Sequence, residues 1–399
     1  MSNKTILILG GGVGGIVAAN ELRRHLGRGH RIIIVDKNRI QTLGLSFLWI
    51  MVGWRKAYAI ERDLSLLEKK GIEFLHAGIT AIDVQHKCVE TEKGKLAYDY
   101  LIIALGAEYA WDAIPGLDGS VNTFYTLGGA EDIYRWLRQS SGRRCDSSSD
   151  TISLVVCSMP YKCPPAPYEA ALLIDSVLRR KPQRKNTIIR VFIPEDTPMK
   201  IAGREAAQAM KGMLESRGIE LVTGRHIRSY DRGASTVQFE SGETVANDFT
   251  IFIPPHRSPQ VVRDAGLTDQ SGWIPVDKHM LTTARENVYA VGDVTTIPLA
   301  SGLVLPKAGI FAMNEAEVVA YNVAQKITGG KLTRLWHWGK ERRFDGAGYC
   351  FIEIGNGKAG YVTGQFYAEP MPKVAFHEPN STYHWGKVVF EKYWLWRWF

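Results

Sequence analysis

One loop of this 399-residue sequence combines residue types that can carry out thiol chemistry. Cys163 follows Lys162 and stands among prolines just before a predicted helix at 168–179, and Glu169 lies in the first turn of that helix. A helix N-terminus and a neighbouring cation both favour the thiolate, the reactive form of cysteine, and Glu169 could exchange protons. The residues alone leave a second interpretation equally open, in which Cys163 is a small buried apolar residue and Glu169 an acid that the helix dipole favours.

A glycine cluster near the N-terminus has the pattern that binds a dinucleotide. Gly10, Gly12 and Gly15 satisfy G-x-G-x-x-G, and an acid that can bind a ribose hydroxyl, Asp36, follows 21 residues after the third glycine. Without side chains the backbone can approach a pyrophosphate at the helix N-terminus. The residues predicted to contact the dinucleotide at this end are Gly10, Gly11, Gly12, Gly14, Gly15, Asp36 and Lys37.

The elements around the glycine cluster predict a βαβ unit. The apolar run 5–9 indicates a buried strand, the helical spacing over 16–26 a helix, and the β-branched run 31–35 a second strand that ends at Asp36. A lone glycine motif is weak, but the motif together with strand, helix and acid is specific. This unit therefore predicts a Rossmann-like domain.

Two later segments indicate that the dinucleotide is FAD. The runs 100–106 and 287–293 are predicted strands, and they end in Gly106 and in the pair Gly292 and Asp293. The second run resembles the carboxy-proximal flavin motif of flavoproteins with two dinucleotide domains, in which the aspartate binds the ribitol hydroxyls. The resemblance implies that FAD is the cofactor.

A second strand and helix, at 151–156 and 168–179, lack the glycines. The loop between them, 157–167, contains four prolines and no glycine. Proline fixes the backbone and has no N–H, so this loop cannot form the same phosphate cradle. Glu195, after a predicted strand at 188–193, stands where an NAD-binding acid could be. We predict that the fold of a nucleotide domain is kept and that its nicotinamide site is lost.

These landmarks predict an α/β protein with two Rossmann-like, three-layer nucleotide-binding domains and a C-terminal aromatic segment. The FAD-binding domain is expected to be discontinuous, at 1–112 and 248–330, with the second domain at 113–247 between its parts. The remaining 331–399 forms the C-terminal region.

The composition of the sequence limits the kinds of partner that the protein can have. The longest uncharged apolar stretch, 43–54, is too short to span a bilayer. The N-terminal apolar run enters the glycine cluster, so it predicts a strand and no signal peptide. Basic residues are scattered despite the net charge of +8, so no nucleic-acid partner is expected. No metal site is predicted.

The segment 161–169 resembles the active-site loop of the sulfide:quinone oxidoreductases, in the flavin disulfide reductase-like superfamily, and of the flavoprotein subunit of flavocytochrome c sulfide dehydrogenase. Further segments match in the same order along the chain: 272–277, 291–294, 306–309 with 314–317, and 348–353. Because the segments are spread over nearly the whole chain, the resemblance is specific.

The resemblance implies that Cys163 and Cys350 form the redox pair, that Glu169 handles protons, and that Lys307 lies at the pyrimidine edge of the flavin. Some relatives attach their flavin through a cysteine soon after the first acid. This sequence has no cysteine between Asp36 and Cys88, so non-covalent FAD is expected.

Three cysteines have no assigned role: Cys88, Cys145 and Cys157. None of the three is a convincing third redox cysteine. The sequence therefore does not indicate how many sulfur atoms the product contains.

The last fifteen residues hold four of the eleven tryptophans, at helical spacing and beside Lys387, Lys392 and Arg397. Such a helix is typical of a monotopic anchor at the membrane interface. The predicted anchor residues are Trp385, Tyr393, Trp394, Trp396, Trp398 and Phe399. A competing interpretation is a helix docked on its own chain or on a second copy in a homo-oligomer. Candidate quinone-lining residues are Phe344, Tyr349 and Phe351.

The predicted function is FAD-dependent oxidation of sulfide to polysulfide or sulfur, with electrons passed to a membrane quinone. A type II NADH:quinone oxidoreductase shares the FAD domain, but the glycine-free loop argues against it. Two further functions stay open: the flavoprotein subunit of flavocytochrome c sulfide dehydrogenase, and a redox sensor that binds FAD without turnover.

Overall fold

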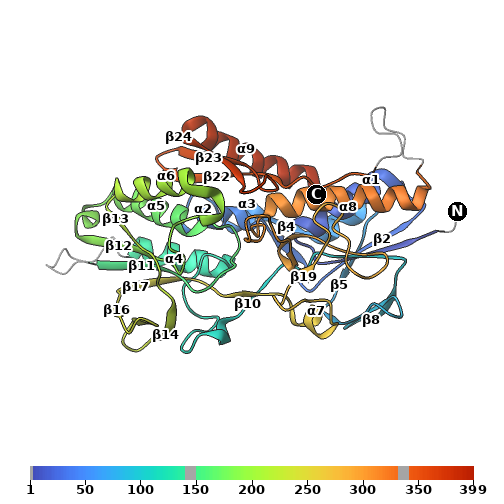
Figure 1. Ribbon diagram of the computed structural model, residues 1–399, viewed down its shortest axis with the longest axis horizontal. Helices are drawn as coiled ribbons and strands as arrows, with labels where there is room; N and C mark the ends of the chain where they lie inside the picture. The colour runs from blue at the N-terminus through green and yellow to red at the C-terminus, as the bar shows by residue number, and fades with distance from the viewer. Residues whose placement is uncertain (1–2, 140–149, 331–340) are drawn as a thin grey trace.

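The computed structural model describes residues 3–139, 150–330 and 341–399. Two α/β units lie side by side, and a three-stranded antiparallel sheet with a long terminal helix lies across one side of both (Figure 1). This arrangement confirms the predicted α/β class with two Rossmann-like units.

The first unit is built on a parallel sheet of five strands. Its order is β20-β9-β1-β2-β5. The bounds are β1 (Thr5–Leu9), β2 (Arg31–Asp36), β5 (Glu73–His76), β9 (Tyr100–Ile103) and β20 (Val288–Ala290). The central strand is fully buried from Ile6 onward because elements cover both faces of the sheet, which explains its continuous apolar run.

Helices cover one face of this sheet and smaller elements the other. On the first face α1 (Val13–Leu26) packs closely against α8 (Gly309–Thr328). The second face contacts a three-stranded hairpin sheet and α7 (Gln260–Asp264). The strands of this hairpin sheet are β6 (Ile79–Asp83), β7 (Cys88–Thr91) and β8 (Gly94–Ala97).

The second unit is a parallel sheet in the order β13-β12-β11-β17. Its strands are β11 (Asp150–Val156), β12 (Thr187–Phe192), β13 (Ile219–Val222) and β17 (Phe249–Ile253). The crossover helices are α5 (Ala166–Leu178) and α6 (Gly203–Glu215). The predicted strand, glycine-free loop and helix therefore occupy the expected positions.

The boundary between the units differs from the prediction. The first unit was expected to resume at 248, but β17 pairs in parallel with β11, from Ile152 opposite Phe249 to Val156 opposite Ile253. The second unit therefore extends through Ile253. A buried parallel strand carries no local mark of the sheet that it joins, so only the pairing places this boundary.

The C-terminal region forms an antiparallel sheet and one helix. The sheet contains β22 (Ala347–Gly355), β23 (Lys358–Gln365) and β24 (Lys373–Asn380), and α9 (Ser381–Trp398) follows directly. The Asn380 side chain accepts the Tyr383 N–H at 3.0 Å and caps α9. Strand β22 packs on α5, and α9 packs on β23, so this region contacts the second unit and its own sheet.

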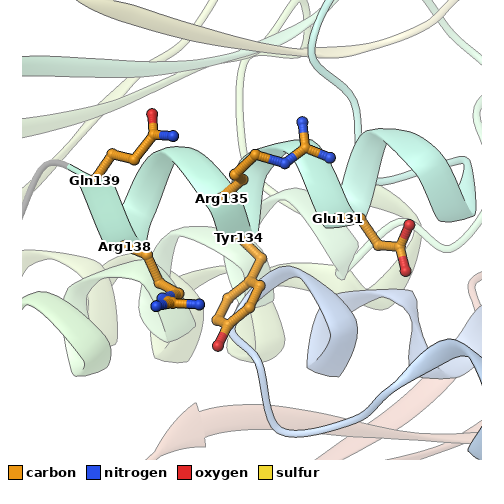
Figure 2. A pocket seen from close by; sticks show the side chains of 5 residues that line it. All are labelled: Glu131, Tyr134, Arg135, Arg138 and Gln139. Carbon is orange, nitrogen blue, oxygen red and sulfur yellow. The ribbon is translucent and has the colours of Figure 1, made fainter.

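Three further helices are α2 (Phe47–Met51), α3 (Ala57–Ile60) and α4 (Leu127–Gln139), and α2 packs against α4 and α5. A hollow of about 540 Å³ on α4 belongs to no predicted site. Figure 2 shows its lining residues: Glu131, Tyr134, Arg135, Arg138 and Gln139. Within the described ranges, no helix is long and apolar enough to cross a membrane.

Candidate active site

The glycine turn after β1 is a tightly packed backbone feature. Gly10 has φ +104°, and a Cβ there would lie 2.4 Å from the Ala104 carbonyl oxygen. A Cβ on Gly15 would lie 1.9 Å from the Gly10 carbonyl oxygen. At Gly12, the N-cap of α1, a Cβ would have no described atom within 4 Å. Two glycines are thus required by the fold, while the third leaves open space at a helix N-terminus, where a phosphate binds.

Asp36 at the end of β2 fixes this turn. One carboxylate oxygen accepts the Gly11 N–H at 2.6 Å, and the other accepts the Asn38 N–H at 2.7 Å. Gly14 lies against Val291, with a Cβ position 3.1 Å from the valine Cγ2. The side chain of Lys37 is exposed beside Asp36.

The turn after β20 faces the same helix layer. Gly292 has φ +77°, and its N–H donates to Glu315 of α8 at 2.6 Å. The neighbouring Asp293 has a buried carboxylate oxygen that accepts no hydrogen bond from any residue that the structure describes. A buried unpartnered acceptor indicates that a bound group donates to it. Gly106, just after β9, has φ +66° and open space at its Cβ position.

Lys307 joins this turn to the cysteine loop. Its Nζ donates to the carbonyl oxygens of Asp293 at 2.7 Å and Thr295 at 3.0 Å, and lies 3.4 Å from the ring centroid of Trp273. Burial lowers its pKa to about 8. Its backbone carbonyl accepts the Cys163 N–H at 2.7 Å. The first unit therefore holds the cysteine loop of the second.

The two predicted redox cysteines meet although 187 positions separate them. Cys163 precedes α5 with φ +56°, a left-handed conformation that is uncommon outside glycine, and Cys350 lies in the middle of β22. Both are free thiols with some exposed surface, Cys350 donates to the Phe351 carbonyl oxygen at 3.6 Å, and Cys350 is close enough to Cys163 to raise the pKa of its thiol. Two thiols in contact and open to a small molecule can form and break a disulfide.

The pKa of the Cys163 thiol differs from the expectation that its surroundings favour the thiolate. The hydrogen bond with Cys350, burial and the charge of Glu169 raise its pKa well above the usual value. Lys162 donates to the Tyr109 hydroxyl at 2.9 Å. Burial lowers the pKa of Lys162, but the charges of Tyr109, Asp293 and Cys163 raise it overall, so this cation also faces the thiol as expected. A second cation, Lys387 of α9, lowers the pKa of Cys163.

Glu169, in the first turn of α5, forms a buried ion pair with Lys387. The glutamate is 1 % exposed and the lysine 5 %. Burial raises the pKa of Glu169, and Lys387 opposes that shift. The sequence pattern had placed Lys387 among cations that face lipid, and this expectation is wrong. The helical spacing of His384, Lys387 and Glu391 was a signal for a shared polar face, which the structure buries.

Helix α9 has two different faces. The exposed face carries Trp385, Val389, Tyr393 and Trp396, which are 50–75 % exposed. Two predicted anchor residues do not lie on this face: Trp394 is 1 % and Trp398 4 % exposed, because both pack into the main core. Phe399 is partly buried against that core.

The three candidate quinone-lining aromatics fall in two clusters. Phe344 is buried against Phe311 and Tyr367. Tyr349 and Phe351 flank Cys350 in β22 and contact a different group of rings under α9: Tyr361, Phe390 and each other. Of the three, Tyr349 and Phe351 neighbour Cys350 along the strand.

The remaining cysteines differ from the pair. Cys157 is buried at the end of β11, and burial raises the pKa of its thiol far above the usual value. Cys88 is partly exposed in β7. Cys145 lies outside the described residues.

The chain belongs to the pyridine nucleotide-disulphide oxidoreductase family, whose sequence model matches residues 4–152 and 183–318. The matched part covers both turns of the first unit and most strands of the second. The residues between the two matched parts, 153–182, contain Cys163 and Glu169, and the residues after the match, from 319, contain Cys350 and α9.

Individual relatives extend the similarity to the whole chain. A sulfide-quinone reductase of Aquifex aeolicus is 26% identical over 99% of this chain and 91% of its own length. The solved structure of the Aquifex aeolicus sulfide:quinone oxidoreductase superposes with a TM-score of 0.84 at 24% identity, covering 99% of this chain and 91% of that one.

A demethylphylloquinone reductase of Synechocystis is 28% identical over 82% of this chain and 80% of its own. The mouse mitochondrial sulfide:quinone oxidoreductase is 24% identical over 73% of this chain and 66% of its own.

Proposed function

We propose that the protein is a sulfide:quinone oxidoreductase that oxidises sulfide to polysulfide or sulfur through Cys163 and Cys350 and passes the electrons through FAD to a quinone. The observation that carries the proposal is the contact of the two thiols at the glycine-free loop, held by Lys307 beside the Gly292 turn. The similarity to sulfide:quinone oxidoreductases along the whole chain supports it.

The chemistry of the pair starts from its disulfide form. Hydrosulfide attacks one sulfur, the S–S bond breaks, and a new S–S bond joins the incoming sulfur to that cysteine while the other cysteine leaves as a thiolate. Glu169, buried against the pair, is the proposed proton carrier.

The residues of the first unit fit non-covalent FAD. The open space at Gly12 accepts a pyrophosphate, Asp293 offers an unpartnered acceptor for a ribitol hydroxyl, and Lys307 supplies a cation beside it. FAD bound there would supply the two-electron acceptor that allows the persulfide and the thiolate left by the attack to be joined, and a quinone would take up these electrons. The protein positions the pair and excludes NADH, because the loop 157–167 has four prolines and no glycine.

The exposed aromatic face of α9 is the proposed membrane contact. Indole and phenol rings lie favourably at the depth of lipid headgroups. A lipid-soluble quinone would then reach the protein from the bilayer, with Tyr349 and Phe351 as candidate liners.

Stopped-flow spectroscopy tests the reaction. Anaerobic sulfide should bleach the flavin band, and decylubiquinone should restore it, whereas NADH should leave the band unchanged. Bleaching by NADH and not by sulfide would favour a type II NADH:quinone oxidoreductase. Reoxidation by cytochrome c and not by the quinone would favour the flavocytochrome c subunit.

Vesicle co-sedimentation tests the membrane contact. Replacing Trp385 and Trp396 by serine should reduce binding to anionic phospholipid vesicles about tenfold or more, since both rings are largely exposed. Trp111→Ser, at a partly exposed tryptophan outside α9, serves as the control and should bind like the parent protein. Equal binding by all three proteins would remove α9 as the anchor.

A further inference from the structure

The helix that carries the proposed membrane contact also reaches the redox cysteines. Three charged residues on its buried side form ion pairs with the protein body: His384 with Glu353 at 2.9 Å, Glu391 with Arg55 at 2.9 Å, and Lys387 with Glu169. The partners come from β22, from the segment between α2 and α3, and from α5. These ion pairs therefore attach one face of α9 to three separate elements.

Lys387 is the central member of this row and the one beside the cysteines. Its ammonium lies 5.2 Å from the ring centroid of Trp49 and is held by Glu169, in the first turn of the helix that follows Cys163. A cation in a site of low polarity acts strongly on neighbouring charges. The charge of Lys387 lowers the pKa of Cys163, and the charge of Cys350 in turn raises that of Lys387.

The other charged groups around the pair act in both directions. Glu169 disfavours a thiolate at Cys163, whereas Lys162, which donates to Tyr109, is attracted to the Cys163 charge from within the cysteine loop. The titratable groups that face Lys387 from the elements packed around it are Glu169, Glu353, Cys350 and Cys163. His384 and Glu391 of the same helix are held in the neighbouring ion pairs with Glu353 and Arg55.

We propose that Lys387 of α9 is a positioning residue for the redox pair: docked through Glu169, it stabilises the thiolate that forms when the Cys163–Cys350 bond is opened. For its role in turnover the proposal rests on the proposed function. The thiolate leaves next to a fixed positive charge, and the proton carrier Glu169 is held at the same place. The helix that contacts lipid is then also part of the thiol site.

Thiol alkylation tests the proposal without sulfide or quinone. The FAD-loaded protein is reduced, treated with iodoacetamide between pH 6 and 10, and the modification of each cysteine is measured by mass spectrometry. In Lys387→Met, the alkylation rate of the pair should fall about tenfold at each pH below the thiol midpoint, because the cation that favours the thiolate is gone. Cys88 in the same chain is the internal reference and should be unchanged.

Matched variants separate charge from structure. Lys387→Arg keeps the charge and should react within about threefold of the parent protein. Lys392→Met removes an exposed cation further along α9 and should change nothing. An unaltered pH profile in Lys387→Met, with its flavin spectrum retained, would overturn the proposal.

Glu169→Gln provides an independent test in the opposite direction. It removes a negative charge that disfavours the thiolate and frees Lys387 to face the thiols, so the midpoint should fall. If Lys387→Met loses its flavin and cannot be measured, the result for Glu169→Gln is used. An alkylation midpoint that is unchanged or raised in Glu169→Gln would exclude the proposed role of Lys387. Failure of sulfide to bleach the flavin would instead count against the proposed function and leave the alkylation result intact.

Discussion

The turns that follow the first strand of each Rossmann-like unit occupy the same place in the fold and are built for different tasks. After β1 the turn consists of glycines, and the backbone comes within contact of Ala104 and of itself. After β11 the turn contains three prolines and Cys163, whose N–H is bound to Lys307, and a fourth proline lies in the first turn of α5. The first turn offers backbone to a ligand, and the second offers a side chain.

This difference shows how one fold supports two roles. A phosphate cradle needs backbone N–H groups and space, which glycines leave and prolines remove. A thiol site needs a fixed side chain, and prolines hold the chain while a neighbouring unit supplies the hydrogen bond. The second turn therefore works only when the first unit is folded beside it.

The largest expected effect would show that the two turns have different functions. Cys163→Ser or Cys350→Ser should lower sulfide-dependent quinone reduction about a thousandfold or more, because no disulfide can form, while the flavin spectrum stays intact. Steady-state assays with decylubiquinone and absorption spectra measure both quantities. Cys88→Ser, in a hairpin of the first unit, is the control and should keep full activity. Loss of flavin in the cysteine variants would contradict the separation of roles.

The second prediction concerns the glycines of the first turn. Gly15→Ala should lower the free energy of unfolding of the apoprotein by about 3 kcal/mol, because its Cβ would overlap the Gly10 carbonyl. Gly12→Ala should change that stability by less than about 1 kcal/mol and still weaken FAD binding, since the space at Gly12 is proposed for the pyrophosphate. Urea unfolding and flavin-release titrations distinguish the variants. Native FAD affinity in Gly12→Ala would contradict this placement of the cofactor.

The smallest predicted effect is a pH dependence in the first unit. Burial raises the pKa of Glu315 to about 7, above its value in the unfolded chain. Between about pH 4.5 and 7 the folded apoprotein holds a proton that the unfolded chain releases, so the free energy of unfolding falls as pH rises. Glu315→Gln should remove roughly 2–3 kcal/mol of this decline. Urea midpoints from pH 5 to 8 measure it, and parallel curves for both proteins would show that Glu315 does not titrate in this range.

Much of the fold follows from local pattern. The run 5–9 forms β1, the helical spacing after Gly12 forms α1, and the segments around the second turn form β11 and α5. The boundary at 248 was wrong, because β17 is as apolar as any strand of the first sheet and only its pairing shows which sheet it joins.

The candidate site was predicted only in part from the sequence. The family resemblance named Cys163 and Cys350, and the structure brings them together. The ion pair of Glu169 with Lys387 and the burial of Trp394 were missed, because both depend on how α9 is rotated when it docks. A tryptophan or a lysine at helical spacing is compatible with lipid, solvent or core.

The sequence by itself determined the features that the backbone enforces. Glycine is required where a Cβ cannot fit, and proline removes a backbone N–H group. These two residue types determine what each turn can bind, independently of the residues around it. Only the tertiary structure decided which charges and thiols meet, because Cys163, Cys350 and Lys387 come from three different elements of the fold. Their approach depends on the packing of the whole chain, and the chemistry of the pair depends on that approach.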